Sequence, residues 1–286
     1  MQQIADTAVG PIEYRLESGQ PEAAGQSCPV VLVLNGGHAS RDSRFGHEKL
    51  TAEGFTVLTP SRPGYDDTPP TVGKTAQAAA DAMVALLDEL DIETVDVIGI
   101  SAAGPTALAL ASRRPDRVRR LVLECAMTWP WGPVIKRRAS RLFGPSQGFT
   151  WAMVRGLLKV APRLTMKAML AEMTTLDAGE VLDRMSAEER AYVRQVFMTS
   201  RSGQGFVLDL EHEISDLSEI SVPVLALYSP NDKTVPPAHA ERVRDEVPGA
   251  ELVSVPSDSH FIWIGSCAEQ VWQRRLAFLR SGQTGQ

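Results

Sequence analysis

Short apolar runs alternate with amphipathic stretches along most of the chain, and this pattern predicts strands that alternate with helices. The runs rich in β-branched residues predict strands at about 29–34, 55–59, 94–100, 118–124, 222–228 and 251–255. Apolar positions at helical spacing predict helices at about 72–90, 102–113, 238–245 and 261–280. A hairpin at 5–17, turning near Gly10-Pro11, precedes them. Such alternation predicts a parallel sheet with helices on both faces.

Residues 128–216 interrupt this alternation. They contain helical patterns, several methionines and no convincing strand, and they include Trp129, Trp131 and Trp151. We therefore expect a helical cap at 128–216, inserted into a sheet domain formed by residues 1–127 and 217–286.

Ser101 lies where the strand at 94–100 gives way to a helix, within the run Gly99-Ile100-Ser101-Ala102-Ala103-Gly104. A strand that reverses sharply into a helix strains the turn residue, so its neighbours must be small. The serine oxygen is then exposed beside helix-end amides. Close strand-to-helix packing would favour the same residues, but the position makes Ser101 the candidate nucleophile.

Two further polar side chains follow later strands. His260 lies in a loop between a strand and an apolar helix, where its imidazole can serve as general base towards Ser101. Asp232 follows the strand at 222–228, and its carboxylate can hold the histidine in the required tautomer. Glu124, at the end of another strand, is the alternative acid.

The turn Asn35-Gly36-Gly37-His38 follows the strand at 29–34. A tetrahedral oxyanion needs preorganised amide donors, and we assign that task to the amides of Gly37 and Ala102. His38 fits a packing or hydrogen-bonding role better than a catalytic one. The candidate substrate contacts are His38, Met127, Trp129 and Trp151.

These motifs together resemble the α/β-hydrolase superfamily, in the group of capped esterases, lipases and carbon–carbon bond hydrolases. Asn35-Gly36-Gly37 is similar to the family's His-Gly-x turn, and Arg62-Pro63-Gly64-Tyr65 to its Arg-Pro-Gly loop. Ser101, Asp232 and His260 stand in the family's order of nucleophile, acid and histidine. The resemblance implies an α/β fold with a mostly parallel eight-stranded sheet, flanking helices and an inserted helical cap.

Three positions depart from the family pattern: Asn35 replaces a histidine, Asp66 stands where glycine is usual, and Ala103 replaces the last glycine of the serine motif. None of these changes removes a group that the chemistry requires. They bear on the substrate more than on the mechanism.

We therefore predict a serine hydrolase that forms an acyl-enzyme on a small to medium apolar carboxylic ester, with neither a metal nor an organic cofactor. Hydrolysis of a carbon–carbon bond in a β-diketone or ring-cleavage product is the alternative reaction. A ligand-binding protein that retained the fold is the alternative outside enzymes. An epoxide or haloalkane hydrolase is disfavoured, because such relatives carry Asp where this chain has Ser101.

Composition and charge restrict the classes of binding partner and the cellular compartment that we expect. A net charge of −6 and a pI near 5.5 argue against nucleic-acid binding. The predicted hydrolase chemistry makes a small-molecule substrate the expected partner. The 286 residues include three cysteines without metal-binding spacing, which fit reduced thiols in the cytoplasm. The chain shows neither a signal-peptide pattern nor an apolar run long enough to insert stably into a membrane. The apolar helix at 72–90 can pack on its own sheet or on a partner, which leaves a homodimer open.

Residues 133–170 carry eight Lys or Arg and no Asp or Glu. The basic residues are Lys136, Arg137, Arg138, Arg141, Arg155, Lys159, Arg163 and Lys167. The interleaved apolar residues are Trp151, Met153, Leu157, Leu158, Met166 and Met169. The simplest interpretation is a solvated basic face with the apolar residues packed on the sheet domain, while basic amphipathic helices also suit anionic substrates or lipid surfaces.

Overall fold

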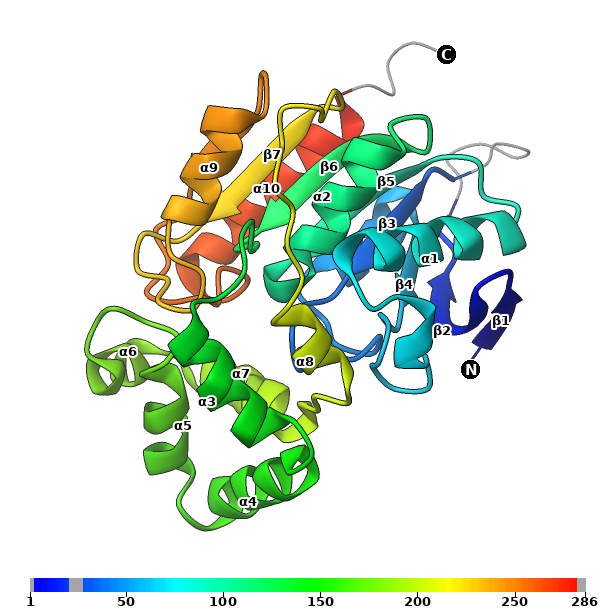
Figure 1. Cartoon of the computed structure of the whole chain (residues 1–286). Helices are drawn as coiled ribbons and strands as arrows, with labels where there is room; N and C mark the ends of the chain where they lie inside the picture. Colours follow the sequence, from blue (N-terminus) through cyan, green and yellow to red (C-terminus); the bar gives the residue numbers. More distant parts are fainter. Residues whose placement is uncertain (1–2, 21–27, 282–286) are drawn as a thin grey trace.

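An eight-stranded sheet forms the centre of the molecule in the computed structural model, which describes residues 3–20 and 28–281 (Figure 1). The outermost ends of the predicted sheet domain, 1–2 and 282–286, lie outside the described residues. The strand order is β1-β2-β4-β3-β5-β6-β7-β8. The β1–β2 and β2–β4 pairings are antiparallel, and all pairings from β4 to β8 are parallel. The strands are β1 Gln3–Thr7, β2 Gly10–Glu17, β3 Val30–Leu34, β4 Thr56–Pro60, β5 Val95–Ile100, β6 Val118–Glu124, β7 Val224–Tyr228 and β8 Glu251–Ser254. The predicted eight-stranded, mostly parallel sheet is confirmed.

The strands are buried on both faces, because helices cover each side. In β3, Leu32 and Leu34 belong to the core under one face, and Val31 and Val33 to the core under the other. Helices α1 Ala76–Glu89, α2 Gly104–Arg113 and α9 Ala238–Glu246 contribute to the first core. The 3-10 helix His47–Glu53 and α10 Ala268–Arg280 contribute to the second. This is why the strands appear in the sequence as continuous apolar runs.

Two predicted helices begin later than the sequence pattern suggested. Helix α1 begins at Ala76 instead of 72, because the Thr75 side chain accepts a hydrogen bond from the Ala78 amide and caps the helix there. Helix α10 begins at Ala268 instead of 261. Phe261 is buried in the loop that follows His260, and burial explains its apolar character without a helix.

Between β6 and β7 the described chain forms no named strand but a series of helices joined by loops, which we call the helical insertion. They are α3 Pro133–Phe143, α4 Gln147–Val160, α5 Pro162–Leu170, α6 Ala178–Arg184, α7 Ala187–Thr199 and α8 Gly205–Asp209. Figure 1 shows α3 to α7 gathered beside the sheet domain, with α8 between the two and α4 at the far end. Within the described residues, no helix combines the length and apolar character that crossing a bilayer would require.

Candidate active site

The turn that carries Ser101 joins β5 to α2. Ser101 itself has φ 51°, a left-handed conformation that non-glycine residues rarely adopt, and its side chain is half-buried. Gly104 lies against the Met127 carbonyl, and a Cβ at Gly99 would come within 2.6 Å of the Ala107 side chain. The small residues around Ser101 therefore meet the close packing of strand and helix that the sequence motif predicted.

His260 and Asp232 form a buried hydrogen-bonded pair. The His260 Nδ1 lies 2.6 Å from Asp232 Oδ2, and both side chains are almost fully buried. The other Asp232 oxygen, Oδ1, accepts a 2.9 Å hydrogen bond from the Val235 amide. The carboxylate is thus fixed at both oxygens, and the imidazole keeps Nε2 for another partner.

The segment after β6 connects this pair to the Ser101 turn. The Met127 amide donates to the Ser101 carbonyl at 2.9 Å. Two residues earlier, the Cys125 sulfur, an Asp232 oxygen and a His260 nitrogen all lie within 4.8 Å of one another. One short stretch of chain therefore contacts both the serine turn and the histidine–aspartate pair.

Cys125 is a residue that sequence reasoning missed. It is buried with φ 45°, and burial raises the pKa of its thiol well above the usual value, with the Asp232 carboxylate adding to the effect. Cys125, Asp232 and His260 are the ligand types that zinc takes in proteins. Such an ion would compete with the 2.6 Å hydrogen bond that already joins His260 to Asp232.

The Asn35–His38 turn lies against the Ser101 turn. A Cβ at Gly36 would approach the Ser101 Cβ to 2.9 Å, and one at Gly37 would lie 3.4 Å from the Ala102 Cβ. Glycine at both positions lets this backbone approach the serine. The two turns that were predicted to supply amide donors are therefore neighbours.

A buried ion pair anchors the Asn35–His38 turn from behind. The Arg62 guanidinium donates from Nε to the Asn35 carbonyl at 2.7 Å and binds the Asp209 carboxylate with both terminal nitrogens, at 2.5 and 2.8 Å. The Tyr65 hydroxyl donates to the same carboxylate at 2.5 Å. The predicted Arg-Pro-Gly loop thus ties the turn to α8, a partner far away in sequence.

Glu124 makes a different set of contacts from those of Asp232. Its carboxylate binds Arg275 through two hydrogen bonds of 2.7 and 2.8 Å and accepts a third, of 2.5 Å, from the Trp263 indole. Both charged side chains are almost fully buried. The structure therefore places the alternative acid in a structural ion pair, while the histidine pairs with Asp232.

A loop of the helical insertion fastens the histidine and aspartate loops together. The Met173 carbonyl accepts from the His260 amide at 2.9 Å, and the Thr175 amide donates to the Asn231 carbonyl at 3.0 Å. Thr174 pairs with Asp232 in an isolated β-bridge. No periodic pattern marks these residues, so the sequence offered no signal for the contact.

Aromatic rings gather over the Asn35–His38 turn. The His38 ring centroid lies 3.8 Å from Phe206, 4.4 Å from Phe143 and 5.2 Å from Trp151. The Ser202 hydroxyl lies 2.8 Å from His38 Nδ1 and accepts from the Trp151 indole at 2.8 Å. We call His38, Phe143, Trp151 and Phe206 the aromatic group.

The four predicted substrate contacts do not form one set. His38 and Trp151 belong to the aromatic group, whereas Trp129 stacks on His239 with ring centroids 4.4 Å apart. Met127 meets the serine turn through its backbone. Phe143 and Phe206 were missed, because lone phenylalanines in a helical pattern resemble ordinary core residues.

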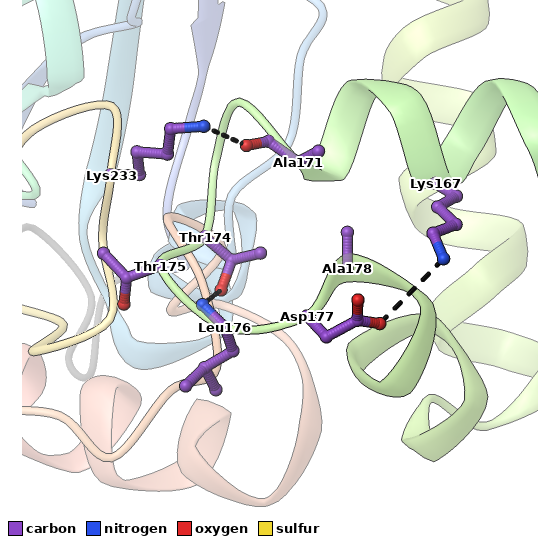
Figure 2. A pocket seen from close by; sticks show the side chains of 8 residues that line it. All are labelled: Lys167, Ala171, Thr174, Thr175, Leu176, Asp177, Ala178 and Lys233. Atoms are coloured by element: carbon purple, nitrogen blue, oxygen red, sulfur yellow. Dashed lines mark hydrogen bonds and ion pairs between the residues drawn. The ribbon is translucent and has the colours of Figure 1, made fainter.

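A surface pocket lies beside these loops (Figure 2). It is lined by Lys167, Ala171, Thr174, Thr175, Leu176, Asp177, Ala178 and Lys233. The Lys233 ammonium donates to the Ala171 carbonyl at 2.5 Å, and Lys167 pairs with Asp177. Neither Ser101 nor His260 lines this pocket, so it is distinct from the candidate catalytic centre.

Burial lowers the pKa of four of the five histidines. It lowers the pKa of His38 to about 3 and that of His239 to about 4. The pKa of His47 lies well below the ordinary value, and that of His212 is also lowered. These four imidazoles are therefore neutral in the folded protein at neutral pH.

We expect the protein to lose stability between pH 7 and 5. An unfolded histidine takes up a proton below about pH 6.5, and a buried neutral one does not, so each costs about 1.4 kcal/mol per further pH unit. Urea unfolding at the two pH values measures the loss. His47→Met provides the comparison, because both His47 ring nitrogens are buried without hydrogen-bond partners within the described residues. An unchanged pH dependence in this variant would contradict the assignment.

A strand-turn-helix serine, a buried histidine–aspartate pair and a glycine turn at the same sheet edge define a hydrolase-type site on an α/β fold. A family model described as alpha/beta hydrolase fold matches residues 29–265. The chain belongs to the α/β-hydrolase fold family.

Two curated relatives and one solved structure are similar to this chain over most of its length. The chain is 34% identical, over 95% of its length and 96% of the relative's, to "Uncharacterized hydrolase YcgS" of Bacillus subtilis. It is 27% identical to a 2-hydroxy-6-oxononadienedioate/2-hydroxy-6-oxononatrienedioate hydrolase of Cupriavidus pinatubonensis, over 85% of this chain and 83% of that one. A solved α/β-hydrolase fold protein from Nakamurella multipartita superposes with a TM-score of 0.81 at 24% identity, covering 99% of this chain and all of its own. The two curated relatives support a hydrolase, and the solved structure supports the fold.

Proposed function

We propose that this hydrolase cleaves carboxylic esters through a Ser101–His260–Asp232 triad and an acyl-enzyme. The observation that carries the proposal is the buried 2.6 Å contact between His260 Nδ1 and Asp232, which leaves Nε2 for the serine. The strained Ser101 turn and the neighbouring glycine turn support it. In this proposal the helical insertion acts as the cap, spanning about 128–216.

In the proposed reaction cycle, His260 accepts and returns each proton that is transferred. Ser101 Oγ attacks the ester carbonyl and gives its proton to His260 Nε2, while the amides of Gly37 and Ala102 bind the oxyanion. The tetrahedral intermediate collapses, and His260 returns the proton to the departing alcohol. Water then attacks the acyl-enzyme with His260 again as base, and the acid leaves as Ser101 recovers its proton.

The aromatic group supports an apolar substrate. Phe206 lies directly over Gly37, since a Cβ there would come within 2.9 Å of its ring. His38 is neutral because burial lowers its pKa to about 3, so it brings no charge to this side of the site. An acyl or alkyl group of small to medium size suits such a lining.

Labelling with a fluorophosphonate tests the serine mechanism. We expect one adduct, located at Ser101 by peptide mass spectrometry and absent from Ser101→Ala. A folded protein that does not label would overturn the triad and favour a ligand-binding role.

The relative named as a 2-hydroxy-6-oxononadienedioate hydrolase supports carbon–carbon bond hydrolysis as a second candidate. A matched pair of substrates, a nitrophenyl ester and a vinylogous diketone, separates the two reactions in the wild-type protein. Turnover of the diketone alone would replace the ester proposal while keeping the same triad.

We expect Phe206→Leu to shift acyl preference towards longer chains. The smaller side chain opens space beside Gly37, and one methylene in an apolar pocket is worth roughly tenfold in kcat/KM. The ratio of kcat/KM for hexanoate and acetate nitrophenyl esters measures the shift. Phe55→Leu is the control, since Phe55 is buried in the core that contains Val31 and Val33, whereas Phe206 belongs to a separate cluster. An equal kcat/KM ratio in both variants would show that the aromatic group does not line the acyl site.

A further inference from the structure

Helix α4 exposes an apolar stripe. Phe149, Met153, Leu157 and Val160 follow one another at helical spacing and are 74%, 48%, 47% and 85% exposed. Trp151, on the other side of the helix, is buried. The sequence pattern predicted that Met153 and Leu157 pack on the sheet domain, and that prediction is wrong, because both are about half exposed. The helix is apolar on both sides, and none of the residues that the structure describes covers the exposed side.

Helices α3 and α5, which contact α4, also expose apolar side chains. Val134, Ile135 and Leu142 in α3 and Leu164 in α5 are also exposed. Eight of the eleven large apolar side chains exposed within residues 3–20 and 28–281 therefore lie between 134 and 164. We call these eight the apolar surface. Exposed apolar side chains concentrated on neighbouring helices are typical of an interaction site, whereas singly scattered ones need no explanation.

Positive charge accompanies the apolar surface. Residues 133–170 contain eight basic and no acidic side chains, on a chain whose net charge is −6. Four of the eight bind acidic residues elsewhere in the helical insertion: Lys136, Arg138, Arg163 and Lys167. The other four have no ion pair among the described residues: Arg137, Arg141, Arg155 and Lys159. Lys159 and Arg141 are exposed beside Val160 and Leu142.

We propose that the outer face of α3, α4 and α5 docks on an anionic lipid surface. Apolar side chains enter the boundary between headgroups and acyl chains, while the flanking cations stay with the lipid phosphates. The contact is peripheral, since none of the described helices can cross a bilayer. At such a surface the enzyme would meet apolar substrates that partition into lipid, but the docking does not depend on the proposed reaction.

The charge favours lipid over a second copy of this chain. A two-fold interface brings the same patch of both subunits together. It would therefore set the unpaired cations of one copy, among them Arg141 and Lys159, near those of the other, with no acidic side chain between 133 and 170 to offset them. An anionic bilayer complements both the apolar and the basic parts of the face.

Flotation with vesicles tests the proposal. The full-length protein should float with phosphatidylcholine vesicles that contain about one third phosphatidylglycerol, and much less with phosphatidylcholine alone. Arg141→Glu/Lys159→Glu should weaken this partition at least about 25-fold, because each cation near an anionic surface contributes about fivefold. Phe149→Ser/Leu157→Ser/Val160→Ser should abolish it.

A matched variant and an activity measurement distinguish loss of lipid docking from a general effect of the substitutions. Ile4→Ser/Val9→Ser removes exposed apolar side chains from the β1–β2 hairpin, far from α4 (Figure 1), and should float as the wild type does. Turnover of a water-soluble ester should be unchanged in the triple serine variant, so the docking and the reaction can fail separately. No flotation, equal flotation with neutral vesicles, or a dimer in solution that the triple variant dissociates would each overturn the proposal.

Discussion

Asp232→Asn should reduce kcat by about 10³- to 10⁴-fold and leave the fold intact. The asparagine can keep the Val235 contact through its oxygen, and its NH₂ group then faces His260 Nδ1. That contact favours the tautomer with the proton on Nε2, the nitrogen that must receive the serine proton. Steady-state kinetics on a nitrophenyl ester, together with urea unfolding, measures both quantities.

Asp258→Asn is the matched control. Asp258 is two residues from His260, but its carboxylate binds Arg184 at the surface. We expect this variant to keep wild-type kcat. If Asp232→Asn retained a tenth or more of the wild-type rate, the histidine would have to be oriented by another group, and the proposed triad would be wrong.

The positions of Ser101, Asp232 and His260 could be predicted because parallel strands deliver their loops to one sheet edge. Buried strands appear in the sequence as apolar runs, so the residue after each run was a natural candidate. The choice between Asp232 and Glu124 could not be made this way. It depends on Arg275 and Trp263, which lie more than 130 residues beyond Glu124 and become its partners only in the fold.

The helices of the insertion could be predicted from the sequence, but which of their faces are buried and which are exposed could not. An apolar position at helical spacing is the same in sequence whether a core, a substrate or solvent lies beside it. Trp151 and Leu157 both fitted one apolar face, yet Trp151 is buried and Leu157 is 47% exposed. The contacts of Met173 and Thr175 with the His260 and Asp232 loops use backbone atoms, so the residue types do not reveal them.

Glu124→Gln should lower the free energy of unfolding by about 3–5 kcal/mol. The change leaves the Arg275 guanidinium buried without its counter-ion, and Arg275 is only 1% exposed. The glutamine oxygen can still accept one hydrogen bond, and the 3.0 Å bond to the Phe45 carbonyl remains, but neither supplies the lost negative charge. Urea unfolding of the variant measures the loss.

The double variant Glu124→Gln/Arg275→Met tests whether the lost stability comes from an unpaired buried charge or from altered packing. With both charges gone the core holds an amide and an apolar chain, so most of the lost stability should return. Per folded molecule, Glu124→Gln should keep a kcat within a few-fold of wild type, unlike Asp232→Asn. A loss of kcat as large as that of Asp232→Asn, in protein still folded, would give Glu124 a part in the chemistry and contradict its structural role. The two carboxylates thus lie at the same sheet edge, and their different partners predict opposite effects: one on catalysis, the other on stability.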